Sequence, residues 1–232
     1  LRDDHTISEY TKSVIRKVSE QGIEFMLATG RIFGGARKYA RELNLNTPIL
    51  ACNGALIKEA GGELLYGRPL PEKALEEIFR LLTERNIYFH CYAEESFYTE
   101  KIAGSLASFY SFNNAQPKED RFPIVEIEPM ELIGKDAVYK VLARYDDEED
   151  RKDLYDCLNG IPGTSVTVSW LNSFDICADQ VSKSSAIDRY AREKGIDPSE
   201  IICFGDNYND IDMIRYAGLG IVPENAAKEI KE

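Results

Sequence analysis

The sequence predicts an α/β protein in which an α+β insertion interrupts a parallel strand–helix core. Short apolar strands alternate with helices near both ends of the chain, polar turns follow those strands, and the middle of the chain is typical of antiparallel hairpins. A length of 232 residues allows one large or two modest domains. With 44% hydrophobic and 29% charged residues, the chain has the composition of a globular protein with a substantial core.

The N-terminal part of the chain alternates helix and strand. Residues 6–20 carry apolar side chains at helical spacing, and Gly22 follows as a stop signal, which predicts a helix. We expect strands at 23–28 and 48–52 and a helix at 32–43 between them. Short strands separated by helices of this length favour parallel pairing.

The pattern becomes antiparallel after Gly61-Gly62 and returns to helix and strand at Ser182. The predicted elements of the middle block are hairpins at 87–99 and 165–178, a strand at 137–144, and helices at 71–85, 104–112 and 148–158. A helix at 184–194 and a strand at 201–204 follow. We therefore place an inserted domain at 67–179 and a discontinuous core at 1–66 and 180–232. Such an insertion can serve as a lid over a site.

Composition bears on partners and location. The net charge is −12 and no basic run occurs, so we expect no nucleic-acid partner. No apolar stretch approaches the roughly 20 residues of a membrane span, so we expect no membrane partner. The five cysteines are scattered and form no CxxC pair, which favours reduced thiols and a cytoplasmic location over a disulfide framework or a zinc site.

The most informative segment is the polar turn 205–210, Gly-Asp-Asn-Tyr-Asn-Asp, between the apolar strand 201–204 and an apolar helical segment. Its carboxylates and carboxamides follow the carboxyl end of a strand, where open α/β sheets bind ligands. Hard oxygen ligands of this kind suit Mg²⁺. The alternative is an acidic turn in which Asp and Asn cap the following helix.

Three further positions carry possible chemistry. Thr29-Gly30 ends a strand, so a hydroxyl and N–H groups can face an anion, although a helix cap with a turn glycine explains the same residues. Lys183 precedes the predicted helix at 184–194 and offers a point charge to phosphate, unless it is a solvated surface lysine. Asn53 ends the next strand, where it either contacts a ligand or makes a tight turn.

The order of these motifs along the chain resembles the haloacid-dehalogenase-like superfamily. More narrowly, it resembles the Cof-type phosphatases, which carry a large α/β cap between their second and third core motifs. The matching order is Thr-Gly-Arg, Asn-Gly-Ala, the antiparallel insertion, Ser-Lys-Ser-Ser-Ala and Gly-Asp-Asn-Tyr-Asn-Asp. The resemblance covers essentially the whole chain. It implies a Rossmann-like parallel-sheet core with an inserted α+β cap domain.

The resemblance also implies site residues. Asp206 would bind Mg²⁺ directly, and Asp210 would support it through water or by orienting Asp206. The phosphoryl oxygens would be held by Lys183, Asn209, the Thr29 hydroxyl and the Gly30 N–H. Arg31 and Asn53 lie beside these motifs and are weaker candidates.

The resemblance further implies an activity: Mg²⁺-dependent hydrolysis of small phosphorylated metabolites through an aspartyl-phosphate. The polar and aromatic composition of the cap, with His90, Tyr92, Tyr98 and Trp170, favours sugar phosphates. We expect a monomer or a small homo-oligomer.

The departure from the family is at the two ends. The first motif, Asp-x-Asp-Gly-Thr-Leu, which carries the nucleophile, does not occur in these residues, and adjacent Asp3 and Asp4 do not replace it because no strand precedes them. The further strand and helix that usually follow are also not found after Lys228. Two explanations stay open: the polypeptide extends beyond both ends, or it is a fragment that binds phosphate without turnover.

Two rival functions come from other classes. A dinucleotide-dependent oxidoreductase is disfavoured because Gly30, Gly34 and Gly35 do not fit G-x-G-x-x-G and no acidic residue ends the following strand. A non-catalytic phosphometabolite-binding protein remains the alternative to the phosphatase.

Overall fold

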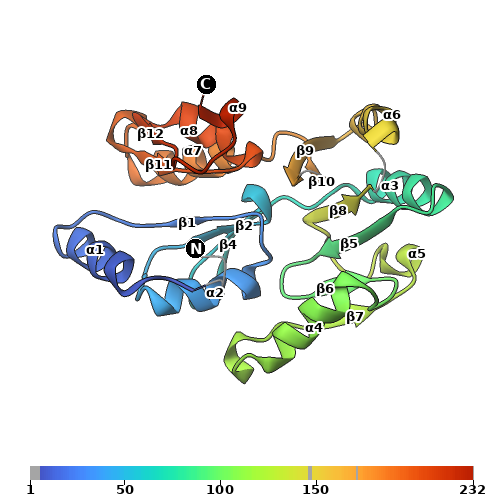
Figure 1. The fold of residues 1–232 in the computed structure, drawn as a ribbon, viewed down its shortest axis with the longest axis horizontal. Helices are drawn as coiled ribbons and strands as arrows, with labels where there is room; N and C mark the ends of the chain where they lie inside the picture. Colours follow the sequence, from blue (N-terminus) through green and yellow to red (C-terminus); the bar gives the residue numbers. More distant parts are fainter. Residues whose placement is uncertain (1–5, 146–147, 171, 232) are drawn as a thin grey trace.

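The computed structural model describes residues 6–145, 148–170 and 172–231 (Figure 1). The strands in these residues form a four-stranded, a six-stranded and a two-stranded sheet. In Figure 1 the four-stranded sheet lies beside the six-stranded one, and the C-terminal segment lies across from the first sheet. The arrangement is the predicted α/β core with an α+β cap between its two parts.

The four-stranded sheet forms one part of the core. Its strands, in spatial order, are β1 (Leu27–Ala28), β2 (Ile49–Ala51), β3 (Leu56–Lys58) and β4 (Leu64–Gly67), with α1 (Glu9–Glu20) and α2 (Phe33–Glu42) as its helices. Strands β1 and β2 pair in parallel, as predicted. Strands β3 and β4 extend the sheet antiparallel and were not predicted, because their short hairpin surrounds the glycine pair that marked the change of pattern.

Strand β1 is shorter than the predicted strand at 23–28. Among the described strands it pairs with β2 only, through Leu27 and Ala28, and Ile23 is 56% exposed. A strand is defined by its hydrogen bonds to a neighbouring strand, and the three residues of β2 supply only a few such hydrogen-bond partners. Residues 23–26 therefore remain outside the strand even though their side chains favour one.

The six-stranded sheet forms the cap. Its strands, in spatial order, are β7 (Ile124–Glu126), β6 (Phe97–Thr99), β5 (Tyr88–Tyr92), β8 (Lys140–Arg144), β10 (Ser173–Ala178) and β9 (Thr164–Trp170). Its helices are α3 (Glu72–Glu84), α4 (Ser105–Ala115), α5 (Pro129–Leu132) and α6 (Glu148–Asn159). Helices α3 and α6 contribute Phe79 and Leu158 to one apolar cluster with Phe89 and Val141 of the sheet, so they cover one face of it.

The C-terminal segment completes the core. It contains α7 (Lys183–Lys194), β11 (Ile202–Phe204), α8 (Ile211–Tyr216), β12 (Leu219–Ile221) and α9 (Lys228–Lys231). Helix α7 begins with a capping box between Ser182 and Ser185 and ends at Gly195, whose positive φ of 70° suits the left-handed helix stop. Strand β11 pairs in parallel with β12 and with no other strand in the described ranges.

Core and cap contact each other through side chains of both. An apolar cluster joins Ile32 at the start of α2 to Phe97, Leu106 and Phe122 of the cap. The buried Lys58 of β3 forms ion pairs with Glu94 and Glu95 in the turn between β5 and β6. In the part of the chain that the structure describes, no helix has both the length and the apolar character needed to cross a membrane.

Candidate active site

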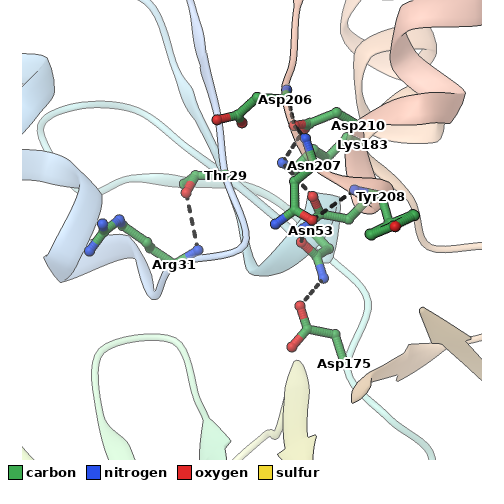
Figure 2. A network of polar contacts seen from close by, with 10 residues as sticks. Thr29, Arg31, Asn53, Asp175, Lys183, Asp206, Asn207, Tyr208 and Asp210 are labelled. Carbon is green, nitrogen blue, oxygen red and sulfur yellow. Dashed lines mark hydrogen bonds and ion pairs between the residues drawn. The ribbon is translucent and has the colours of Figure 1, made fainter. Parts of the chain in front are cut away.

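The polar residues predicted from the sequence gather where β1, β2 and β11 end (Figure 2). Thr29 and Gly30 follow β1, Asn53 lies in the turn after β2, and the segment beginning at Gly205 follows β11. The carboxyl ends of parallel strands are the usual ligand-binding edge of an α/β sheet. The local backbone at each of these positions explains how the side chains meet.

Asp210 organises the turn after β11. One carboxylate oxygen accepts the backbone N–H groups of Asp206 and Asn207, at 3.1 and 3.0 Å. The close packing requires Gly205, because a Cβ at that residue would lie 2.4 Å from the Cβ of Asp210. Asp210 is itself buried, so the turn is held from inside.

The other oxygen of Asp210 pairs with Lys183. The Lys183 ammonium lies 2.5 Å from Asp210 Oδ1 and 3.4 Å from Asn209 Oδ1, and both partners of the ion pair are only 6% exposed. Lys183 is the first residue of α7, so the helix start aims it at the turn. This burial excludes the solvated surface lysine considered from the sequence.

Asp206 differs from Asp210 in exposure and contacts. It is exposed, and its carboxylate has no hydrogen bond or ion pair with the residues that the structure describes. A carboxylate held at a rigid turn with both oxygens available suits a hard cation such as Mg²⁺, which keeps much of its shell for water and phosphate. The described residues contain no cluster of three or more His, Cys, Asp or Glu side chains suited to a metal ion.

Asn53 connects this turn to the rest of the site. It has a positive φ of 58°, in the left-handed region that asparagine tolerates better than most residues. Its side-chain oxygen accepts a hydrogen bond from Asn209 Nδ2 at 3.0 Å, and its Nδ2 donates to Asp175 Oδ2 at 2.8 Å. Asn53 therefore makes the tight turn considered from the sequence and also contacts polar side chains of the protein, while its contact with a ligand stays a prediction.

The Thr29-Gly30-Arg31 segment lies next to Asn53. A Cβ on Gly30 would lie 2.7 Å from Asn53 Oδ1, so this close approach depends on glycine. Thr29 Oγ1 accepts the Arg31 N–H at 3.1 Å, which leaves the hydroxyl proton to donate elsewhere. The Arg31 guanidinium lies 5.7 Å from the centre of the Tyr39 ring and extends away from Lys183 in Figure 2.

Two functional-site neighbours were missed from the sequence. Lys140 of β8 and Asp175 of β10 form an ion pair of 3.1 Å with both side chains almost fully buried. The Lys140 ammonium also donates to the Gly30 carbonyl at 2.6 Å, so this pair of cap residues reaches the core site. The sequence feature that could have revealed both residues is a charged side chain within an apolar strand, because such a side chain is rarely buried without a partner.

The charge of Lys140 is stabilised by its surroundings. Burial by itself lowers the pKa of Lys140, but the facing Asp175 carboxylate, followed by Tyr92, raises that pKa above its ordinary value. The ammonium also lies 4.3 Å from the centre of the Tyr92 ring. Lys140 is therefore a permanent cation at the junction of cap and core.

The cap residues singled out from the sequence lie in different places. Tyr92 is at the junction, and His90 lies behind it, with its Nε2 3.1 Å from the Tyr92 hydroxyl. Tyr98 points the other way, into the apolar cluster under α3, and its hydroxyl donates to Asp136. The side chain of Trp170, like Asp3 and Asp4, lies outside what the structure describes.

Comparison with known proteins agrees with the family resemblance seen in the sequence. The profile of a family described as haloacid dehalogenase-like hydrolase matches residues 1–232. A putative phosphatase of Haemophilus influenzae is 28% identical over all of this chain and 86% of its own length. A 5-amino-6-(5-phospho-D-ribitylamino)uracil phosphatase of Bacillus subtilis is 26% identical, with the same coverage of 100% and 86%.

Solved structures share the fold. A haloacid dehalogenase-like hydrolase from B. subtilis superposes with a TM-score of 0.87 at 22% identity, covering 100% of this chain and 88% of that one. A sugar phosphatase of subclass IIB superposes with a TM-score of 0.80 at 22% identity, covering 98% and 84%. At this level of identity the structures establish the fold of core and cap.

Proposed function

This chain belongs to the haloacid dehalogenase-like hydrolases, as a phosphatase of the Cof type, and from that premise we propose that it hydrolyses small phosphorylated metabolites with Mg²⁺ as cofactor. The observation that carries the proposal is that the buried Lys183 of α7 contacts the turn after β11, and that the same turn carries the exposed Asp206, whose carboxylate has no partner among the described residues. A cation and a free carboxylate at the ends of parallel strands suit a phosphate group and its metal ion.

We propose that Asp206 holds the metal and that Asp210 keeps it in place. Both oxygens of Asp210 are already engaged, by Lys183 and by two backbone N–H groups, which favours the orienting role over direct ligation. When bound, Mg²⁺ would offset negative charge on the phosphoryl oxygens.

The phosphoryl group would be held by Lys183, Asn209, the Thr29 hydroxyl and the Gly30 N–H. Lys183 has three N–H donors, and its contacts with Asn209 and Asp210 account for two of them, so one remains for a phosphoryl oxygen. Arg31 is the weakest member of the predicted set, because its guanidinium packs on Tyr39.

The nucleophile in this proposal is a carboxylate of the first family motif, on a strand that precedes the described residues. Two exposed strand edges support that position. Each of β1 and β11 pairs on one side only among the described strands, and Ile202 and Phe204 of β11 are 56% and 62% exposed. An unpaired apolar strand edge is a template for another strand.

The reaction would then proceed in two steps. The carboxylate attacks phosphorus in line, the bond from phosphorus to the leaving oxygen breaks, and the second acid of the motif protonates the alcohol. Water, deprotonated by that same residue, next attacks phosphorus, and inorganic phosphate leaves as the first carboxylate is restored. Throughout, Lys183 and Asn209 keep the phosphoryl group oriented.

The finer assignments remain proposals of the same kind. Sugar phosphates are the substrate class that the composition of the cap favours. The B. subtilis relative described above is named for a phosphorylated sugar alcohol that carries a uracil ring. The five cysteines are unpaired, which supports a reducing, cytoplasmic location.

The test is release of inorganic phosphate from a panel of sugar and polyol phosphates by the intact protein. We expect turnover that EDTA abolishes and Mg²⁺ restores. Hydrolysis that persists in EDTA would remove Asp206 from its metal-binding role. Saturable binding of the same compounds without phosphate release would instead establish the non-catalytic phosphometabolite-binding protein.

A further inference from the structure

Basic side chains gather on the segment 31–41, directly after the residues proposed to hold the phosphoryl group. The segment carries four basic residues and no acidic one, although the chain as a whole has 40 acidic and 28 basic residues. Arg41 is paired with Asp120, but the side chains of Arg31 and Lys38 have no carboxylate partner among the described residues. In a chain with an excess of acidic residues, cations left without a carboxylate favour an anionic ligand.

The two cations without a carboxylate converge on one aromatic ring. The Arg31 guanidinium carbon lies 5.7 Å, and the Lys38 ammonium 4.7 Å, from the centre of the Tyr39 ring. Since Arg31 precedes α2, this ring reaches back toward the start of the helix, as long helical side chains usually do. Two neighbouring cations repel each other, and an anion bound between them would remove that repulsion.

The hydroxyl of the same tyrosine lacks a partner. Tyr39 is only 5% exposed, and its hydroxyl has no hydrogen-bond partner among the described residues. A buried hydroxyl without a partner is unfavourable, and buried tyrosines usually find one. Because a hydroxyl can donate one hydrogen bond, an anion beside the two cations would supply the missing acceptor.

Packing of the cations on the ring does not by itself explain this cluster. Cation–π contacts engage the face of an aromatic ring and would account for the positions of Arg31 and Lys38. They leave the Tyr39 hydroxyl, at the edge of the ring, without an acceptor. The unpaired hydroxyl is therefore an observation independent of the two charges, and both point to an anion.

The cluster lies beside the proposed phosphate site, where core and cap meet. The Lys38 ammonium is 4.7 Å from the centre of the Phe112 ring, which belongs to α4 of the cap. The backbone N–H of Arg31 donates to Thr29 Oγ1, whereas its side chain extends away from Lys183 (Figure 2). A phosphoryl group at Thr29 and an anion at the Arg31 guanidinium would thus be separated by the length of an arginine side chain.

We propose that Arg31, Lys38 and the Tyr39 hydroxyl form a second anion-binding site, which binds a second acidic group, phosphate or carboxylate, on the leaving group of the substrate. The guanidinium and the ammonium pair with the oxygens of that group, and the hydroxyl donates to one of them. This inference rests on the proposed phosphatase function and narrows its substrate to metabolites with two anionic groups. Free inorganic phosphate has the same chemistry, so the test separates these two sources.

The matched substrates for the test are fructose 1,6-bisphosphate and its two monophosphates, which share the sugar and differ in the number of anionic groups. For the intact protein we expect kcat/KM to be at least about tenfold higher for the bisphosphate than for either monophosphate. The gain should come from a lower KM, because the second group contributes to binding. Equal or faster hydrolysis of a monophosphate would overturn the proposal.

Two lysine variants test whether Lys38 causes this preference. Lys38→Met should lower the preference for the bisphosphate at least about fivefold. Lys17→Met is the matched control, since Lys17 is an exposed lysine of α1 whose side chain has no hydrogen bond or ion pair within the described ranges. It should leave the preference unchanged. An equal loss in both variants would mean that the preference reflects the overall charge of the protein and would contradict the role of Lys38.

Tyr39→Phe removes the hydroxyl alone and gives two measurements. Because the hydroxyl has no partner in the free protein, the midpoint of urea unfolding should not fall. The preference for the bisphosphate should nevertheless fall at least about threefold. A lower midpoint would show that the hydroxyl stabilises the fold, and an unchanged preference would exclude it from the site; either result contradicts its assignment.

Calorimetric titration of the intact protein separates this inference from the proposed function. Saturable binding of fructose 1,6-bisphosphate that Lys38→Met weakens, without phosphate release from any ester, would support the second site and contradict the phosphatase. Hydrolysis of the monophosphates with no gain for the bisphosphate would do the reverse. If Lys38→Met weakened only the binding of inorganic phosphate, the site would belong to the free anion and its role in substrate binding would be overturned. Absence of any bisphosphate binding would overturn it as well.

Discussion

Two buried lysine–aspartate pairs lie within the same polar network and have different surroundings. Lys183 and Asp210 both belong to the C-terminal part of the core, 27 residues apart, and the second oxygen of Asp210 binds N–H groups of its own turn. Lys140 and Asp175 belong to the cap, yet they bind Gly30 and Asn53 of the core. One pair organises a loop, and the other joins two domains.

The difference shows that the role of a buried ion pair depends on which other groups its lysine and its aspartate contact. The Lys183 pair leaves a donor directed at the site where a phosphate is proposed. The Lys140 ammonium is surrounded by Asp175, the Gly30 carbonyl and the Tyr92 ring, so it has little capacity left for a ligand. We therefore expect the first pair to matter for catalysis and the second for stability.

The largest expected effect is on catalysis. Lys183→Ala removes the cation proposed to face the transferring phosphoryl group, and kcat/KM should fall by about 10³- to 10⁵-fold, as for other charges that contact such a group. The measurement is steady-state phosphate release by the intact protein.

Lys140→Met is the companion variant, since it also removes a buried lysine from the network. It should lower kcat/KM by less than about tenfold, because Lys140 is not proposed to touch the substrate's phosphate. If the two variants lost activity equally, the comparison between the pairs would fail.

The next effect is on stability. Lys140→Met leaves Asp175 as a buried charge without its cation, and the free energy of unfolding should fall by about 3 to 5 kcal/mol. The double variant Lys140→Met, Asp175→Leu removes both charges and should recover part of that loss. Urea unfolding of the three proteins gives the numbers. A double variant less stable than the single one would show that the hydrogen bond from Asn53 to Asp175 matters more than the charge.

A smaller effect concerns pH. The pKa of His90 is lowered to about 3 in the folded protein by burial and by Lys140, from an ordinary value of 6.5. Because the folded state favours the neutral ring, the contribution of His90 to stability is constant above pH 6.5 and falls as the pH drops below it. Between pH 7 and 5 the loss should be roughly 2 kcal/mol.

The variant His90→Gln tests this pH dependence, since glutamine keeps polar atoms but does not titrate there. Its free energy of unfolding should vary less between pH 7 and 5 than that of the native protein. In Lys140→Met, the pKa of His90 should rise, because one of its two causes is gone. An unchanged slope in His90→Gln would assign the pH dependence to other groups.

The smallest effect is at an exposed pair. Arg85 and Asp153 form an ion pair of 2.6 Å on the cap surface, with side chains 34% and 69% exposed. Solvent screens such a pair, so Arg85→Met should change the free energy of unfolding by less than about 0.5 kcal/mol. A loss of stability comparable to that of Lys140→Met would show that burial does not explain the different stability contributions of the exposed and the buried ion pair.

Most of the helices and the central strands were predictable because their apolar spacing is local. The helices α1, α2 and α7, with caps at Ser8 and Ser182, lie within a few residues of their predicted bounds. Hairpin β3–β4 and the short extent of β1 were not predictable, since both depend on which strands pair. Pairing is decided between segments that are distant in the sequence.

By itself the sequence determined the polar turn after β11, the residues near it and the family to which they belong. Tertiary structure decided what each of those residues touches: Asp210 turned inward to Lys183, Asp206 turned outward, and Arg31 packed on Tyr39. Only the tertiary structure joined Asn53 to Asp175, 122 residues apart. The physical reason is that burial, which gives an ion pair or a stacked ring its strength, exists only after distant segments pack.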